Sequence, residues 1–312
     1  MERMKLKPWH GIVSFVVMMV VFLIAAIPIQ SKLGLIGVAI TELLLLAMAI
    51  GAALIFKQDL KEVFPIRVPK LREVFGVLLF CAGGFIVSIL VATSMALVFP
   101  GMLEVSQEVS GIVTSEGMWL GILIASVMPA ICEEAVHRGF ILHTFKDVKK
   151  QWVIVLSMAI IFGVFHTDVY RFVPTAILGA CMTWVMLKTK NMLMPALYHA
   201  TNNLVPVLMG MASKGLSQAV TTPDGTSVTT VSAISEMEGV MVLSSIGVYL
   251  MLVVVAFPLM LAGTALMKKK DEKIAGKHVA AVFVITGVLF FVGLAIVIGT
   301  TAYIMATQGV GM

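Results

Sequence analysis

Nine apolar runs, separated by short polar or basic segments, constrain the fold of this chain more than any other feature. Each run is long enough to cross about 30 Å of hydrocarbon as a helix that rises about 1.5 Å per residue, although two runs are short and rely on their polar ends. We therefore predict an all-α, polytopic transmembrane helical bundle of about nine spans, which forms a single integral-membrane domain over residues 1–312. The predicted spans are 11–29, 33–56, 74–99, 118–143, 151–167, 171–187, 192–212, 239–267 and 278–306.

The composition indicates the same class of protein. Of the 312 residues, 60% are hydrophobic and only 12% are charged, and the mean hydropathy is +1.04. A soluble domain of this size needs more polar surface. The net charge of +5 does not indicate nucleic-acid binding, because the basic residues form short clusters between the apolar runs and not one patch. We expect a multi-pass membrane protein, surrounded by the lipid bilayer and without a nucleic-acid partner.

Lysine and arginine residues indicate which ends of the spans face the cytoplasm, because cytoplasmic loops are enriched in them. With a cytoplasmic N-terminus, 18 of the 22 basic residues fall on the cytoplasmic side, in clusters at residues 3–7, 57–72, 146–150, 188–190 and 268–277. The remaining four are Arg138, which lies within a run, and Lys32, Arg171 and Lys214 on the other side. The sequence therefore predicts a cytoplasmic N-terminus.

The fourth run ends in CEEAVHRGF, which places ionisable residues in an otherwise apolar helix. A charged residue at the centre of a spanning helix costs about 2.5–3.5 kcal/mol on insertion scales, so several together need compensation. Glu134 and Arg138 are four residues apart and can neutralise each other as an ion pair. Glu133 points about 100° away from Glu134 and is free to meet another helix. Glu133 is therefore the better candidate for chemistry, and the role of His137 on its face stays open.

Two later runs carry a histidine at helical spacing from a second residue. In FGVFHTD, Phe162 precedes His166 by four positions, and in YHATNN, His199 precedes Asn203 by four. Counted from the predicted cytoplasmic helix ends, Glu133 lies about 18 Å deep, His166 about 21 Å and His199 about 12 Å. We therefore expect these helices to meet in one cavity at middle depth, which opens towards the cytoplasmic half.

This combination of side chains suits the hydrolysis of an amide bond. A carboxylate and a histidine can take a proton from water, and a second histidine with a carboxamide can stabilise an oxyanion. The set of Glu133, His166 and His199 can instead bind a divalent metal such as zinc with an open position, although the chain has no HExxH motif. A metal cofactor and the absence of any cofactor both stay open.

The motifs, in this order and spacing, resemble the CPBP family of intramembrane proteases, also called the CAAX protease and bacteriocin-processing, or Abi, family. The resemblance covers residues 118–207, the predicted catalytic core helices, and rests on EExxxR (Glu133, Glu134, Arg138), FxxxH (Phe162, His166) and HxxxN (His199, Asn203). It implies an intramembrane endopeptidase. Eukaryotic members remove the last three residues of prenylated CAAX proteins, and bacterial relatives are linked to peptide processing and bacteriocin self-immunity.

The resemblance also implies a role for each motif residue: activation of the attacking water by Glu133 with His166, stabilisation of the oxyanion by His199 and Asn203, and support of the site by Glu134 with Arg138. The family has been described both as metal-dependent and as using a metal-free glutamate mechanism, and the sequence leaves this open. The substrate that we expect is a membrane-bound or lipid-modified protein or peptide, and the location that we expect is a bacterial cell membrane.

Two other functions and one further residue stay open. In a proton-coupled transporter, Glu133 and His166 would relay protons, although the chain lacks matching Gly- or Pro-broken helices in two halves. A non-enzymatic membrane scaffold or bacteriocin immunity factor would keep the motifs for helix packing. Glu42 lies within AITELLLLAMAI without a polar residue three or four positions away, so a structural or gating role and a contact with substrate are both open for it.

Overall fold

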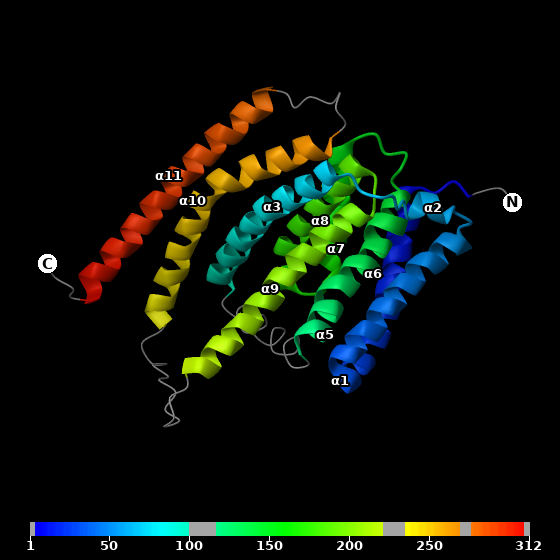
Figure 1. Cartoon of the computed structure of the whole chain (residues 1–312), viewed down its shortest axis with the longest axis horizontal. Helices are drawn as coiled ribbons and strands as arrows, with labels where there is room; N and C mark the ends of the chain where they lie inside the picture. The colour runs from blue at the N-terminus through cyan, green and yellow to red at the C-terminus, as the bar shows by residue number, and fades with distance from the viewer. Residues whose placement is uncertain (1–3, 100–116, 221–234, 269–275, 309–312) are drawn as a thin grey trace.

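The computed structural model describes residues 4–99, 117–220, 235–268 and 276–308, and these residues form helices and connections without a strand. The predicted all-α class is therefore confirmed. Figure 1 shows the helices side by side in one bundle. The elements are α1 (Pro8–Ile55), α2 (Leu60–Val63), α3 (Leu71–Val98), α5 (Met118–Ile122), η1 (Leu123–Val127), α6 (Met128–Glu134), η2 (Ala135–Ile141), α7 (Gln151–Phe165), α8 (Val169–Thr189), α9 (Leu193–Val220), α10 (Ser235–Met267) and α11 (Gly276–Gln308).

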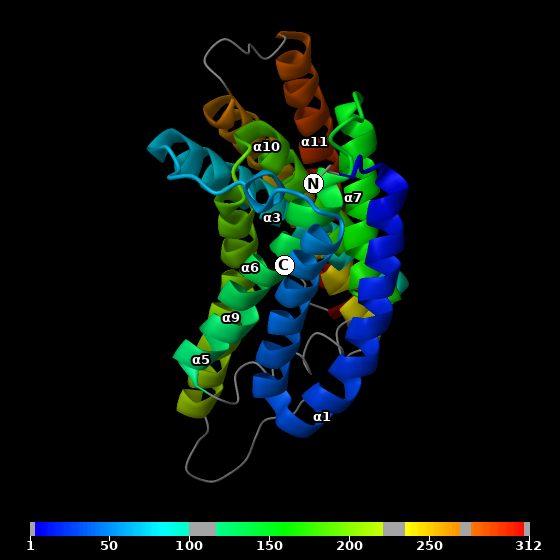
Figure 2. The same ribbon diagram turned by 90° about the vertical axis from the view of Figure 1, so that its right-hand side faces the viewer.

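Helix α1 contains the first two predicted spans, folded as two arms that meet at a sharp turn. Gly34 leaves the helical region with φ 54° and ψ −130°, a conformation that glycine adopts without a steric penalty. A Cβ at Gly37 would lie 2.6 Å from the carbonyl oxygen of Ile29. Glycine at this position therefore allows the backbones of the two arms to approach closely beside the turn. Figure 2 shows the two arms meeting at the lower end of that view. The turn places Glu42 about two helical turns into the second arm.

Residues 118–141 form one helix in which two π-helical segments, η1 and η2, flank the α-helical segment α6. A π-helical segment widens the helical turn, and such segments are frequent at functional sites. Segment η2 begins directly after Glu134, so His137 and Arg138 lie on a widened turn. The spacing of the EExxxR motif therefore differs from that of a regular α-helix.

Helix α7 is short and ends at a predicted site residue. Its 15 residues span about 22 Å, less than the roughly 30 Å of hydrocarbon. His166 follows its last residue, and α8 begins after Asp168, whose Oδ1 accepts a hydrogen bond of 2.8 Å from the backbone N–H of Tyr170. When α7 starts at one membrane surface, His166 consequently lies within the membrane and not at the opposite surface.

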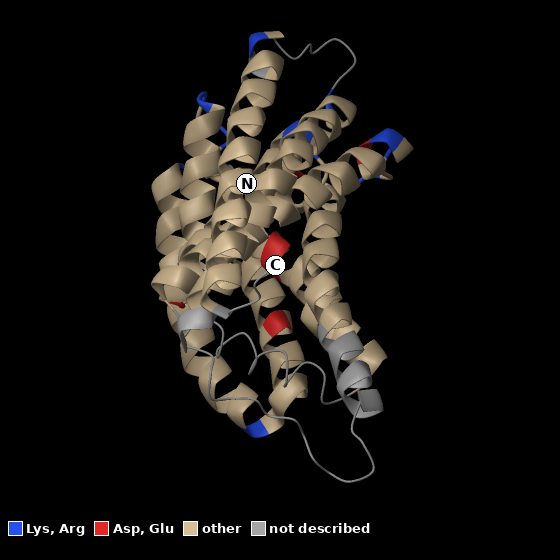
Figure 3. Cartoon of the chain, turned by 90° about the vertical axis from the view of Figure 1, so that its left-hand side faces the viewer, with Lys and Arg blue, Asp and Glu red and all other residues tan. Residues whose placement is uncertain are grey.

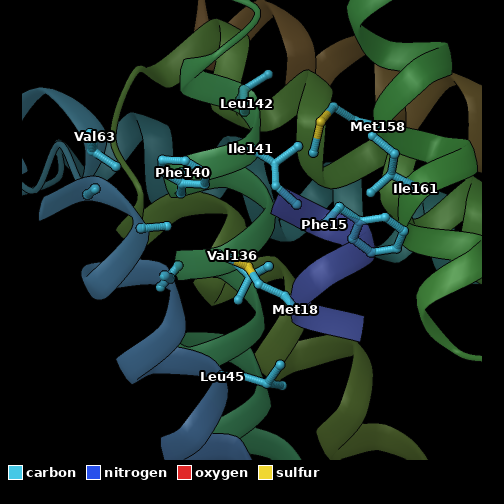
Figure 4. Close-up of a cluster of buried hydrophobic side chains, with 14 of the residues drawn as sticks. Phe15, Met18, Leu45, Val63, Val136, Phe140, Ile141, Leu142, Met158 and Ile161 are labelled. Atoms are coloured by element: carbon cyan, nitrogen blue, oxygen red, sulfur yellow. The ribbon is translucent and has the colours of Figure 1, made fainter. Parts of the chain in front are cut away.

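Buried apolar side chains hold the first arm of α1 against the site helix. Phe15 of α1, Val136 and Phe140 of η2, and Met158 of α7 belong to one cluster, shown in Figure 4, and each is at most 6% exposed. Burial of a large apolar side chain stabilises a fold by about 1.5–3 kcal/mol in water, and in lipid the same close packing acts through van der Waals contacts. The cluster therefore fixes the helix that carries Glu133 and Glu134.

Helices α3, α10 and α11 form one flank of the bundle (Figure 1), with α10 between the other two. A Cβ at Gly76 of α3 would lie 2.9 Å from the carbonyl oxygen of Gly263 in α10, and a Cβ at Gly247 of α10 would lie 2.9 Å from that of Gly293 in α11. Small residues let helix backbones approach closely in lipid. Glycines at these crossings therefore allow the three helices to pack.

The extended segment between α2 and α3 is tied to the connection between α8 and α9. Arg67 donates to both carboxylate oxygens of Glu73, at 2.9 and 2.8 Å, and these hydrogen bonds raise the pKa of the Arg67 guanidinium. The side chain of Asn191 accepts from the backbone N–H of Arg67 at 3.2 Å and donates to its carbonyl oxygen at 3.0 Å. These bonds join the N-terminal helices to the predicted catalytic core at the basic end of the bundle.

Among the described residues, six helical stretches are long and apolar enough to cross a membrane: Pro8–Ile55, Leu71–Val98, Met118–Ile141, Val169–Thr189, Gly239–Met267 and Val279–Thr307. Since Pro8–Ile55 contains two predicted spans, and α7 and α9 account for two more, each predicted span corresponds to a helix. Figure 3 shows most of the lysines and arginines towards one end of the bundle and acidic positions near its middle. The number of crossings and the cytoplasmic N-terminus stay predictions.

Candidate active site

A cavity of about 650 Å³ lies among helices α1, α3, α6, α8 and α9. The four residues predicted to be catalytic all line it: Glu133, His166, His199 and Asn203. They come from three parts of the chain, the end of α6, the end of α7 and the middle of α9. Side chains that are up to 70 positions apart in the sequence thus face one space within the bundle.

The carboxyl group of Glu133 is buried and incompletely paired. The residue is 8% exposed, and its Oε2 has no hydrogen-bond partner. A buried polar atom without a partner costs about 1–3 kcal/mol, so such an atom beside a cavity is suited to bind water or a ligand. Glu133 can therefore present a free carboxylate oxygen to a molecule in the cavity.

Glu134 connects the predicted ion pair to a site histidine. Its Oε1 accepts a hydrogen bond from Arg138 Nη1 at 2.8 Å and lies 3.0 Å from His199 Nδ1. All three residues are at most 2% exposed. Because a carboxylate oxygen accepts, His199 donates through Nδ1, and its Nε2 remains for the cavity. The ion pair is thus present as predicted, and Glu134 additionally orients His199.

His166 is oriented in a similar way by the backbone. Its Nδ1 lies 2.9 Å from the carbonyl oxygen of Phe162, which can only accept a hydrogen bond. The proton therefore resides on Nδ1, and Nε2 is left as an acceptor. Both site histidines thus have one fixed ring nitrogen and one free nitrogen.

The ring of Phe162, the aromatic residue of FxxxH, is the packing centre of the site. The residue is fully buried, and the guanidinium of Arg138 lies 4.7 Å from the centre of its ring. Three imidazole rings meet it edge-on, with centroid distances of 5.0, 4.9 and 5.8 Å for His137, His166 and His199. Sequence reasoning found the spacing of Phe162 but not this role, because the contacts come from other helices.

Gly179 of α8 supports Phe162 and Arg138 from behind. A Cβ at Gly179 would lie 2.7 Å from the Cβ of Phe162, so a larger residue would push the ring away. The carbonyl oxygen of Gly179 accepts a hydrogen bond of 2.8 Å from Arg138 Nη2. Gly179 therefore allows α8 to pack closely against Phe162 and Arg138.

His137 does not line the cavity. It is fully buried, and its Nδ1 donates to the carbonyl oxygen of Glu133 at 2.8 Å. Its ring packs against Phe15, Phe162 and Phe165 at centroid distances of 6.2, 5.0 and 4.9 Å. The structure thus resolves the question that spacing left open, because His137 fixes the backbone at Glu133 and does not face a substrate.

The direction of the cavity differs from the expectation. Its lining extends from Glu133 and His199 to Gln30, beside the turn of α1, and to Arg171, at the start of α8. That end of the bundle is opposite to the end that carries most of the lysines and arginines (Figure 3). With the predicted cytoplasmic N-terminus, the cavity extends towards the non-cytoplasmic half. The two predictions, a cytoplasmic N-terminus and an opening towards the cytoplasmic half, therefore do not fit this structure together.

The arrangement of the candidate ligands bears on the alternative of a bound metal ion. Within the described ranges, no group of three His, Cys, Asp or Glu side chains is arranged to hold a metal ion. The candidate ligands Glu133, His166 and His199 line one cavity without forming such a group. In this arrangement the three residues do not fit a three-ligand zinc site.

Comparison with known families agrees with the motifs. Residues 115–205 match the family model "Type II CAAX prenyl endopeptidase Rce1-like". The predicted resemblance to CAAX proteases is confirmed. The match contains all three motifs, and it leaves α1, α3, α10 and α11 outside the matched segment. Since the Rce1-like family consists of intramembrane proteases, it supports an endopeptidase function in the membrane. No curated protein and no solved structure matches the chain.

Proposed function

We propose that this protein is an intramembrane endopeptidase that uses an activated water to hydrolyse peptide bonds in membrane-bound or lipid-modified proteins or peptides. The observation that carries the proposal is the meeting of Glu133, His166, His199 and Asn203 at one buried cavity. A carboxylate, two oriented imidazoles and a carboxamide are the groups that amide hydrolysis needs. The matched family segment supports the same reaction class.

Glu133 acts as the general base in this mechanism. Its unpartnered Oε2 accepts a hydrogen bond from a water molecule in the cavity, and the free Nε2 of His166 accepts the second one. As the water oxygen attacks the carbonyl carbon, its proton moves to Glu133. When the C–N bond breaks, Glu133 returns this proton to the leaving nitrogen. Water therefore supplies OH to the new carboxyl group and H to the new amine.

Asn203 and His199 stabilise the oxyanion of the tetrahedral intermediate. The carboxamide of Asn203 donates through its N–H group in any protonation state. His199 donates through Nε2 when its imidazole is protonated, and the carboxylate of Glu134 at Nδ1 stabilises that cation. Arg138 in turn balances the charge of Glu134, which is fully buried. Hydrogen bonds at a developing oxyanion are stronger in a site that excludes bulk water.

The first test is cleavage of a membrane-peptide library by the purified protein in lipid vesicles. Wild-type protein should give products that mass spectrometry detects, and Glu133→Gln should lower the rate by about 10³-fold, since the amide cannot take a proton from water. Glu62→Gln, a substitution at an exposed position of α2, is the matched control and should keep full activity. Including prenylated and unprenylated peptides in the library identifies the substrate class.

Repeating the cleavage assay with a chelator distinguishes a metal-free mechanism from a metal-dependent one. Activity that survives the chelator supports water activation by Glu133 alone. Activity that is lost with chelator and restored by Zn²⁺ contradicts the metal-free mechanism but keeps the protease. Wild-type protein that cleaves none of the peptides contradicts the proposal and favours the scaffold or the transporter. Proton flux through vesicles that requires Glu133 would favour the transporter.

A further inference from the structure

Three buried polar atoms without a hydrogen-bond partner line the same cavity: Glu133 Oε2, Glu42 Oε2 and Ser88 Oγ. Only Glu133 belongs to a motif. Glu42 comes from the second arm of α1 and Ser88 from α3, and both lie outside the segment that matches the protease family. Since a buried polar atom without a partner costs about 1–3 kcal/mol, the wall formed by α1 and α3 is suited to a ligand with polar groups.

Glu42 lines the cavity, and among the described residues no cation pairs with it. It is 5% exposed, and its neighbours one helical turn away are apolar. The hydroxyl group of the adjacent Thr41 already has its own partners. It accepts a hydrogen bond of 2.8 Å from Gln30 and donates to the carbonyl oxygen of Val38 at 2.9 Å. Glu42 also lies close enough to Glu133 for the two carboxyl groups to interact electrostatically.

The charges around the cavity favour a positively charged ligand. The wall has two carboxyl groups, those of Glu42 and Glu133, and its one guanidinium is that of Arg171, which is exposed at the outer end. Arg138, the other nearby cation, is already bound by Glu134. Buried charges in proteins are almost always paired, so an empty cavity favours a protonated Glu42. A cationic group of a ligand would stabilise its carboxylate form, since no cation among the described residues pairs with it.

We propose that Glu42, together with Ser88, forms a substrate subsite that binds a basic side chain, lysine or arginine, of the peptide to be cleaved. The ammonium or guanidinium group donates to Glu42 Oε2 and to Ser88 Oγ. The aliphatic part of the side chain lies against the apolar lining of the cavity, which includes Val38 and Ile89. This inference rests on the proposed function, and it adds a specificity residue from a helix that has no catalytic motif.

The test compares pairs of peptides that carry either lysine or norleucine near the bond that is cleaved, since norleucine keeps the aliphatic chain without the charge. Wild-type protein should prefer the lysine peptide by at least about 10-fold in kcat/KM. Glu42→Gln should lower kcat/KM for the lysine peptide by about 10–100-fold, which corresponds to the loss of a hydrogen bond between charged groups. The norleucine peptide should change by less than about 3-fold.

Three matched variants sharpen this result. Glu42→Asp keeps the carboxylate and should retain part of the preference, whereas Glu62→Gln in α2 should leave it unchanged. Glu42→Lys should reverse the preference in favour of a glutamate peptide. Equal losses for both peptides in Glu42→Gln would overturn the proposal, because Glu42 would then act on the catalytic water. A wild-type protein without preference for a basic residue would overturn it as well.

A binding measurement separates this inference from the proposed function. Fluorescent lysine and norleucine peptides are titrated into Glu133→Gln protein and into the double variant with Glu42→Gln. Tighter binding of lysine that disappears in the double variant supports the subsite even if no preparation cleaves a peptide. Equal binding in both proteins overturns the subsite even if cleavage depends on Glu133. Elution of each variant as a single species in size-exclusion chromatography confirms that it is folded.

Discussion

At the scale of single residues, the chemistry of the site depends on which ring nitrogen of each histidine carries a proton. Glu134 at His199 Nδ1 and the carbonyl oxygen of Phe162 at His166 Nδ1 leave both Nε2 atoms for the cavity. A neutral His199 has no proton on Nε2, so in that state Asn203 is the oxyanion donor of the two. The two HxxxN residues therefore differ as oxyanion donors, because Asn203 donates in either state of His199 and His199 donates through Nε2 only as the cation.

This division of tasks predicts the effect of Asn203→Ala. Removal of one oxyanion donor lowers kcat by about 10²–10³-fold in other hydrolases. Because the donor acts on the intermediate and not on the bound substrate, KM should change by less than about 3-fold. Steady-state kinetics of the variant in vesicles test this. A rise in KM with unchanged kcat would show that Asn203 binds the substrate instead.

At the scale of elements, the contact between α7 and α8 supports the site. Gly179 allows Phe162 to lie between Arg138 and three histidines, and it accepts a hydrogen bond from Arg138. Gly179→Ala should therefore displace the ring and lower both stability, by about 1–3 kcal/mol as for an overpacked core, and activity. Gly51→Ala in α1 is the control, because a Cβ there meets no atom within 4 Å.

Thermal unfolding in detergent and peptide cleavage test the two glycine variants together. Gly51→Ala should be neutral or stabilising by about 0.5–1 kcal/mol, since alanine favours the helix. Equal stability and activity of both variants would contradict the packing role of Gly179.

The sequence was sufficient to predict the helices and the motif residues, but not the way in which they meet. Apolar length predicts spans, because lipid leaves a buried chain little choice other than helix. Apolar length does not predict the π-helical segments, since Leu123–Val127 is as apolar as the residues around it. The contact between Glu134 and His199 joins residues 65 positions apart on different helices. The spacing of residues along one helix cannot predict such a contact. For the same reason, the direction in which Glu42 points was open.

At the scale of the whole molecule, the direction of the cavity determines the side of the membrane from which substrate enters. The basic residues predict a cytoplasmic N-terminus, and the cavity extends to Gln30 and Arg171 at the other end. A substrate should then approach from the non-cytoplasmic half of the membrane.

Cysteine labelling in intact cells tests this orientation. Cys81, Cys132 and Cys181 are buried, so Lys32→Cys and Lys61→Cys introduce exposed thiols at opposite ends of the bundle. A membrane-impermeant maleimide should label Lys32→Cys in intact cells and Lys61→Cys only after permeabilisation. The reverse pattern would place the cavity on the cytoplasmic side and would restore the expectation from the sequence.

The central claim is that Glu133 activates the water that breaks the peptide bond. The most direct measurement is the single-turnover rate of cleavage of one identified peptide in vesicles, with excess enzyme, for wild type, Glu133→Gln and Glu62→Gln. Excess enzyme removes product release from the rate, and equal peptide binding by all three proteins shows that the site is intact. The account predicts a rate about 10³-fold lower for Glu133→Gln and an unchanged rate for Glu62→Gln. Cleavage by Glu133→Gln at a rate within about 3-fold of the wild type would contradict it.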